Sequence, residues 1–122
     1  MATVELTTDN FAQTLADNDI VLVDFWAAWC GPCRQFGPIF EQVSEKFPEV
    51  AFGKVDTEAQ AELARAANIT SIPTLMAFRE RVLVFSQAGA VGASELTKLV
   101  EAVGALDMDE VKAKIAAQQS DQ

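Results

Sequence analysis

The chain has 122 residues, half of them hydrophobic, and carries a formal net charge of -9 with no histidine. This length predicts one domain with a real apolar core, and the composition is ordinary for a soluble globular protein. Such an acidic chain is a poor candidate for nucleic-acid binding, which needs clustered lysine and arginine. Residues 1–11 lack the features of a signal peptide, and no apolar run could span a membrane, so we expect a cytoplasmic protein without a membrane partner.

The first 26 residues predict a strand, a helix and a second strand. Residues 3–6 alternate apolar and polar side chains, as a short strand at the edge of a sheet does. Polar residues 7–9 can start a helix, and Phe11 and Leu15 give that helix an apolar side. Residues 20–26 form an apolar run that is too continuous for a half-exposed strand, so we place this strand at the centre of a sheet.

Both cysteines follow that apolar run, in the stretch Trp29-Cys30-Gly31-Pro32-Cys33. The next residues have helical apolar spacing, which predicts a helix over about 33–47 that Pro38 kinks and Pro48 ends. The cysteines therefore stand where a helix begins. The helix dipole and the unpaired backbone N–H groups there favour the thiolate over the thiol, and the thiolate is the reactive form.

The stretch 50–68 predicts a strand followed by a helix. Residues 50–55 alternate as a strand does, and residues 58–67 form an alanine-rich helix with Leu63 on its buried side. Asn68 can close that helix in the left-handed conformation.

A hairpin is expected next. Apolar runs at 74–78 and 82–86 flank Arg79-Glu80-Arg81, which predicts two antiparallel strands. Together with the earlier elements, this order mixes a parallel βαβ half with an antiparallel half and predicts an α/β sandwich.

Two helices are expected after the hairpin. Ser94 can cap a core helix that Gly104 ends. Asp107 then begins another helical piece with Val111 on its apolar side, and we expect the polar residues 118–122 to be frayed.

Three interpretations of the cysteine pair can be compared. A structural disulfide is poorly supported, because two intervening residues close a very small loop and gain little from loop closure. Structural zinc needs four ligands, usually Cys or His, so with two cysteines and no histidine zinc could only be shared between subunits. Redox chemistry is therefore the favoured function of Cys30 and Cys33.

Asp24 interrupts the apolar run of the central strand. A carboxylate buried there without a full set of partners would have a raised pKa, which suits it to proton transfer near neutral pH. A buried thiol needs such a base, because burial raises the pKa of the thiol. A solvent-facing Asp24 is the other possibility, and the residues alone leave the two open.

Several separated features of the chain resemble the thioredoxin family over residues 3–104. An apolar strand leads into the cysteine stretch, and Lys54-Val55-Asp56, Ile72-Pro73-Thr74 and Gly89 follow at compatible spacing. The resemblance implies an α/β thioredoxin fold, with a central mixed five-stranded sheet flanked by helices on both faces. It implies a thioredoxin domain over residues 1–104 and does not cover a C-terminal helical extension over 105–122.

The resemblance also implies roles for individual residues. Cys30 would be the exposed attacking thiol, and Cys33 the buried resolving thiol one turn further along the helix. Asp24 would be the buried carboxylate that takes or returns the proton of Cys33, with Lys54 near it to tune it. Pro73 would be preceded by a cis peptide bond and face the disulfide.

A groove for the target backbone is implied as well, lined by Trp29, Gly31, Pro32, Ile72, Pro73 and Gly89. A cis bond before Pro73 would turn the backbone N–H and C=O of Ile72 outward, where an extended target segment can pair with them. The turn Arg79-Glu80-Arg81 departs from the glycine-containing turn of most family members and leaves the turn type open.

The resemblance implies a thiol–disulfide oxidoreductase that reduces disulfides of other proteins, since Gly-Pro between the cysteines resembles the reductases of the superfamily. Electrons would come from NADPH through a separate flavoprotein, thioredoxin reductase; this chain has no dinucleotide motif and would bind no cofactor and no metal. We expect a monomer whose partners are that reductase and disulfide-containing target proteins. The alternative is a binding or chaperone module of the same fold whose redox pair is incidental.

Overall fold

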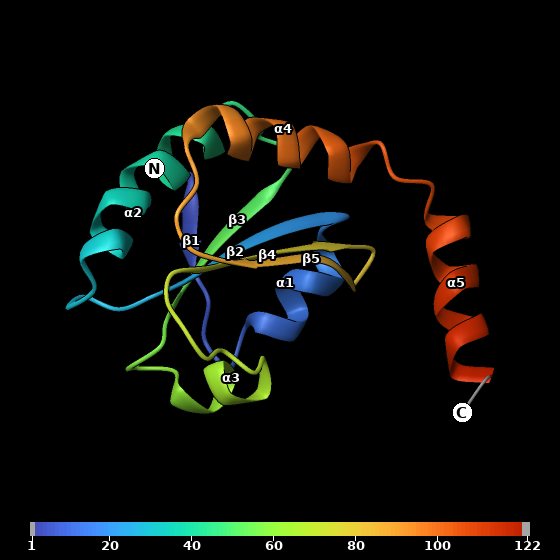
Figure 1. Ribbon diagram of the computed structural model, residues 1–122, viewed down its shortest axis with the longest axis horizontal. Helices are drawn as coiled ribbons and strands as arrows, with labels where there is room; N and C mark the ends of the chain where they lie inside the picture. The colour runs from blue at the N-terminus through green and yellow to red at the C-terminus, as the bar shows by residue number, and fades with distance from the viewer. Residues whose placement is uncertain (1, 121–122) are drawn as a thin grey trace.

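The structure, a computed structural model, describes residues 2–120 (Figure 1). Five strands and five helices are found among these residues, and each predicted strand and helix is present, with bounds that differ at several ends. In chain order the elements are β1 (Thr3–Glu5), α1 (Phe11–Asp17), β2 (Ile20–Trp26), α2 (Gly31–Ser44), β3 (Ala51–Asp56), α3 (Ala61–Ala66), β4 (Thr74–Arg79), β5 (Val82–Ala88), α4 (Ala93–Gly104) and α5 (Met108–Ser120).

The strands form one mixed sheet in the order β1-β3-β2-β4-β5. Strands β1, β3 and β2 are parallel, and β4 pairs antiparallel with both β2 and β5. The apolar strand β2 lies at the centre and β1 at an edge, as predicted. The sheet therefore combines the parallel and antiparallel halves that the order of elements indicated.

Helices cover both faces of the sheet, α2 and α4 on one face and α1 and α3 on the other (Figure 1). Successive side chains of a strand point to opposite faces. Accordingly, Leu22 of β2 packs with Phe36 of α2 and Val100 of α4 in one apolar cluster. Its neighbour Val23 belongs to a second cluster, against which Leu63 of α3 packs, so the prediction that Leu63 faces the core is confirmed.

Helix α2 runs from Gly31 to Ser44, whereas the prediction was 33–47. Proline is favoured in the first turn of a helix, where its missing N–H costs no hydrogen bond, so the residues between the cysteines join the helix. After Ser44 the next N–H groups bond to carbonyls three residues earlier, which winds the chain into tighter turns. The prediction that Pro48 ends the helix is therefore wrong, while Pro38 does lie inside it.

Helices α3 and α4 also begin away from their predicted starts. Helix α3 starts at Ala61 rather than at residue 58, because two backbone N–H groups there donate to Asp56 Oδ1 in a separate turn. Asn68 closes this helix with a φ of 58°, as predicted. The residue that caps α4 is Gly92, and Ser94 lies inside the helix, so the predicted cap is wrong.

The hairpin turns on two residues with positive φ, Glu80 at 51° and Arg81 at 68°. Positive φ at both positions is the pattern of the tight turn that follows the twist of hairpin strands, which settles the turn that the sequence left open. The Glu80 N–H donates to the Asp19 carbonyl at 2.8 Å, and the Glu80 carboxylate pairs with Lys112 of α5 at 2.6 Å. These contacts hold a turn that lacks glycine.

Helix α5 contacts the body of the fold through the buried side chain of Met108 and the Lys112–Glu80 ion pair, and Arg79 holds the chain just before it. The Arg79 guanidinium donates to the carbonyls of Val103 and Gly104 at the end of α4 and of Leu106 in the link to α5. Of the expected frayed tail, residues 118–120 belong to α5, and residues 121–122 lie outside the described residues. Within residues 2–120, each helix is too short or too polar to cross a membrane.

Gly53 of β3 generates a prediction about packing. A Cβ on Gly53 would lie 2.6 Å from Leu6 Cγ, and because Leu6 is itself buried, its side chain or the strand would have to shift within a packed core. Gly53→Ala should therefore lower the free energy of unfolding by about 1–3 kcal/mol, measured by denaturant titration. Gly31→Ala is the control, since a Cβ there meets nothing within 4 Å. Equal stability of the two variants would contradict this packing.

Candidate active site

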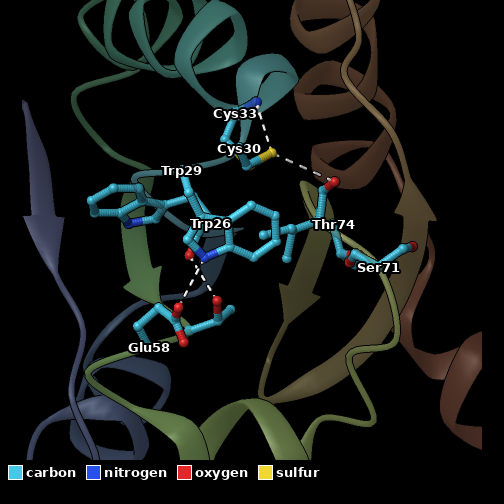
Figure 2. Close-up of a disulfide and its surroundings, with 9 residues drawn as sticks. Trp26, Trp29, Cys30, Cys33, Glu58, Ser71 and Thr74 are labelled. Carbon is cyan, nitrogen blue, oxygen red and sulfur yellow. Dashed lines mark hydrogen bonds between the residues drawn. A yellow bond between two sulfur atoms is a disulfide. The ribbon is translucent and has the colours of Figure 1, made fainter.

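The two cysteines lie where the chain leaves the central strand β2 and enters α2 (Figure 2). Cys30 is the residue that caps the N-terminus of α2, and it is disulfide-bonded to Cys33 with a Cα–Cα distance of 5.2 Å. Cys30 Sγ accepts the backbone N–H of Cys33 at 3.2 Å. The sulfur thus takes the position that a capping side-chain oxygen usually occupies. The backbone N–H groups and the dipole of the first helical turn stabilise it there.

Both sulfur-bearing side chains are buried. Cys33 is 3% exposed, as predicted, but Cys30 is only 5% exposed, so the prediction of an exposed attacking thiol is wrong for this disulfide state. The physical reason is a contact with a remote segment, because the carbonyl oxygen of Ile72 lies 3.7 Å from Cys30 Sγ.

Asp24 is fully buried, and neither of its carboxylate oxygens has a hydrogen-bond partner among residues 2–120. Strand alternation places Asp24 on the same face of β2 as Leu22, which is the face that α2 covers. Burial raises the pKa of Asp24 from 3.8 to about 7, although the positive charge of Lys54 partly offsets the effect. The structure therefore places a carboxyl group with a pKa near neutral pH beneath α2, the helix that begins at the cysteine pair.

Lys54 lies directly opposite Asp24 in the parallel pairing of β2 and β3. Its side chain is half-buried, and Nζ lies 5.1 Å from the centroid of the Trp26 ring. Lys54 is thus held by a cation–π contact on the same face of the sheet as Asp24.

The segment before β4 faces the cysteines. The peptide bond between Ile72 and Pro73 is cis, as the family resemblance implied. The carbonyl of Pro73 accepts the N–H of Gly89 at 2.8 Å, and Gly89 adopts a φ of 101°, a conformation that favours glycine. These contacts bring three of the predicted groove residues together beside Cys30.

The remaining groove residues lie in the loop before α2 and in its first turn. Gly31 and Pro32 are exposed in the first turn of α2, and Trp29 is 68% exposed, which places it on the rim rather than in the core. The Trp29 indole N–H donates to Glu58 Oε1 at 2.8 Å (Figure 2). This hydrogen bond fixes the orientation of a large apolar surface next to the disulfide.

Two of the predicted groove residues line one hollow of about 360 Å³, whose walls are formed by Trp29, Thr57, Ala64, Ile69, Thr70, Ser71 and Ile72. Sequence reasoning identified Trp29 and Ile72 but missed the other five lining residues, and it missed Glu58, which accepts the hydrogen bond of the Trp29 indole. One signal was present: Glu58 follows β3, and the carboxyl ends of parallel strands meet at one edge of a sheet. Among residues 2–120, no group of three or more His, Cys, Asp or Glu side chains could hold a metal ion.

Comparisons with known proteins agree with this geometry. The sequence model of the family described as thioredoxin matches residues 2–104. A protein of Streptomyces coelicolor, provisionally named thioredoxin 2, is 57% identical over 119 residues that cover 98% of this chain and 89% of that protein. Thioredoxin C-3 of Corynebacterium nephridii is 40% identical over 99 residues that cover 80% of this chain and 68% of that protein.

Solved structures show the same architecture. A single-residue mutant of a thioredoxin from Halobacterium salinarum superposes with a TM-score of 0.79 at 30% identity, covering 86% of this chain and 92% of that one. Helix α5 lies beyond the residues that the family model matches.

The raised pKa of Asp24 generates a prediction about stability. The folded state keeps this proton up to about pH 7, whereas the unfolded state loses it near pH 3.8. The contribution of Asp24 to stability is therefore full below pH 3.8 and falls as pH rises towards 7, by at most about 4 kcal/mol. Asp24→Asn should match the oxidised wild type at pH 4 and exceed it in free energy of unfolding at pH 8.

Denaturant unfolding of both oxidised proteins at the two pH values measures the difference. Asp109→Asn, an exposed carboxylate in α5, is the control and should follow the wild type at both. A loss of stability in Asp24→Asn at pH 8 would show that the carboxylate is well solvated or paired.

Proposed function

This chain belongs to the thioredoxin family and is a thiol–disulfide oxidoreductase that reduces protein disulfides, and we propose that Cys30 makes the first attack and Cys33 the second. The observation that carries these roles is the hydrogen bond from the Cys33 N–H to Cys30 Sγ at the start of α2. It stabilises negative charge on the Cys30 sulfur, whereas Cys33 lies further inside the helix.

In the first step, the Cys30 thiolate attacks one sulfur of the target disulfide. A Cys30–target bond forms, the target disulfide breaks, and the leaving sulfur departs as a thiolate that takes a proton from solvent. The cap geometry supports this role, because the positive end of the helix dipole lowers the cost of the attacking anion.

In the second step, Cys33 attacks the Cys30 sulfur and releases the target with both thiols reduced. The protein is left with the Cys30–Cys33 disulfide, which is the state in the structure. Cys33 must lose a proton while buried, and we assign Asp24 as the group that accepts it. With a pKa of about 7, a useful fraction of Asp24 is ionised at neutral pH and can accept the Cys33 proton. The protonated Asp24 can return that proton later. Lys54 would tune this equilibrium through its charge.

The target is proposed to lie across the groove as an extended chain. The Ile72 backbone, close to Cys30, would pair with the target backbone, while Trp29 and the first turn of α2 contact its side chains. Residues 1–104 would form the redox domain and residues 105–122 a helical extension.

The oxidised protein needs two electrons for each turnover. We propose that NADPH supplies them through a separate flavoprotein, thioredoxin reductase, and that the chain itself is a cofactor-free monomer of the reducing cytoplasm. One relative supports this partner: a protein of Mycobacterium leprae named bifunctional thioredoxin reductase/thioredoxin is 39% identical over 98 residues, which cover 79% of this chain and 21% of that protein.

The order of the two attacks can be tested with cysteine variants. Catalytic amounts of the protein are mixed with insulin, NADPH and the reductase of its host, and NADPH consumption is followed. Cys30→Ser should abolish insulin reduction, and Cys33→Ser should accumulate a mixed disulfide that mass spectrometry identifies at Cys30. A fully active Cys30→Ser protein would remove redox chemistry from the function and favour a binding module.

The role of Asp24 predicts different effects on the two steps. Asp24→Asn should slow resolution of the mixed disulfide by about 100-fold at pH 7 and leave its formation within a few-fold of the wild type. Rapid mixing of the reduced protein with a disulfide peptide, quenched by acid, separates the steps. Asp109→Asn should change neither. Equal slowing of both steps by Asp24→Asn would exclude Asp24 from the proton transfer.

A further inference from the structure

Thr74 is a buried polar residue that the mechanism above does not use. Three polar or charged residues are buried among residues 2–120, namely Asp24, Ser44 and Thr74. Asp24 belongs to the redox site, and the Ser44 hydroxyl donates to a carbonyl of its own helix. Thr74, the first residue of β4, is 6% exposed and stands directly after the segment that faces Cys30.

The Thr74 hydroxyl closes a turn around Ile72. Thr74 Oγ1 donates to the carbonyl oxygen of Ser71 at 2.6 Å. On the other side of Ile72, the Pro73 carbonyl accepts the Gly89 N–H at 2.8 Å. The carbonyl groups before and after Ile72 are therefore both fixed, one by a side chain and one by the backbone of a neighbouring loop.

Ile72 is the residue that this pair of hydrogen bonds positions. Its carbonyl oxygen lies 3.7 Å from Cys30 Sγ, and its N–H has no hydrogen-bond partner among residues 2–120. A half-buried residue with an unpaired N–H beside a reactive sulfur offers a docking point for another backbone. The distance from that docking point to Cys30 depends on how firmly the turn is held.

We propose that Thr74 is a positioning residue for polypeptide substrates. Its hydroxyl holds the Ile72 backbone at a fixed distance from Cys30. The inference rests on the proposed function, since it assumes that Ile72 pairs with the target. It specifies which substrates depend on Thr74: disulfides within an extended chain that uses the Ile72 N–H and C=O. A small disulfide without a backbone needs only the sulfur of Cys30.

Two substrates and a set of threonine variants test the proposal. Protein reduced with dithiothreitol and desalted is mixed with increasing insulin, or with the small aromatic disulfide dithiobis(nitrobenzoate), in single turnovers. Thr74→Val removes the hydroxyl at nearly constant volume, and Thr74→Ser keeps it. Thr97→Val is the matched control, because Thr97 Oγ1 donates to the Ala93 carbonyl at 2.8 Å within α4.

Thr74→Val should raise the half-saturating insulin concentration about five-fold, as expected for loss of one hydrogen bond, with the plateau rate within two-fold of the wild type. Its rate with the small disulfide should also stay within two-fold. Thr74→Ser and Thr97→Val should behave as the wild type with both substrates. Thr74→Ala replaces Thr74→Val if the valine variant does not fold.

Three results would overturn the proposal: unchanged insulin saturation in Thr74→Val, an equal loss with both substrates, or a Thr74→Ser protein that behaves as Thr74→Val. The first would make the hydroxyl dispensable, the second would place its effect on the cysteines, and the third would assign the effect to the methyl group. Failure of the wild type to reduce insulin at all would instead contradict the proposed function.

Discussion

The redox site depends on one hydrogen bond, from the Cys33 N–H to Cys30 Sγ in the first turn of α2. This bond exists because β2 ends at Trp26 and the chain enters the helix with Cys30 as its capping residue. A sulfur in that place receives backbone N–H groups and the positive end of the helix dipole, and both stabilise its anion. In our proposal, the remaining parts of the site act on a sulfur that the helix has made reactive.

Asp24 shows that the site is built at some cost to stability. A buried carboxyl group without hydrogen bonds is unfavourable when ionised, and the raised pKa expresses that cost. The register of the sheet keeps the group there, because β2 lies at the centre and Lys54 stands directly opposite on β3. In our proposal the same burial that weakens the fold above neutral pH supplies a base for the second thiol.

Sequence alone predicted the elements of the fold because each has a clear local period, from the continuous apolar run of β2 to the alternation of β3. It failed where distant segments meet. Cys30 was expected to be exposed, and only the fold shows the Ile72 carbonyl beside it. Two helix starts were missed for a different, local reason: Asp56 forms its own turn before α3, and Gly92 caps α4 although Ser94 is the more usual capping residue. The burial of Asp24 was left open by the residues and followed from its central strand.

The most direct test of the account is the reactivity of the two thiols in the reduced protein. The protein is treated with iodoacetamide at pH 7 and sampled over time, and mass spectrometry reports which cysteine is modified. If the helix N-terminus stabilises the Cys30 thiolate, Cys30 reacts many times faster than free cysteine while Cys33 remains unmodified. A Cys30 that reacts no faster than free cysteine, or no faster than Cys33, would contradict the account.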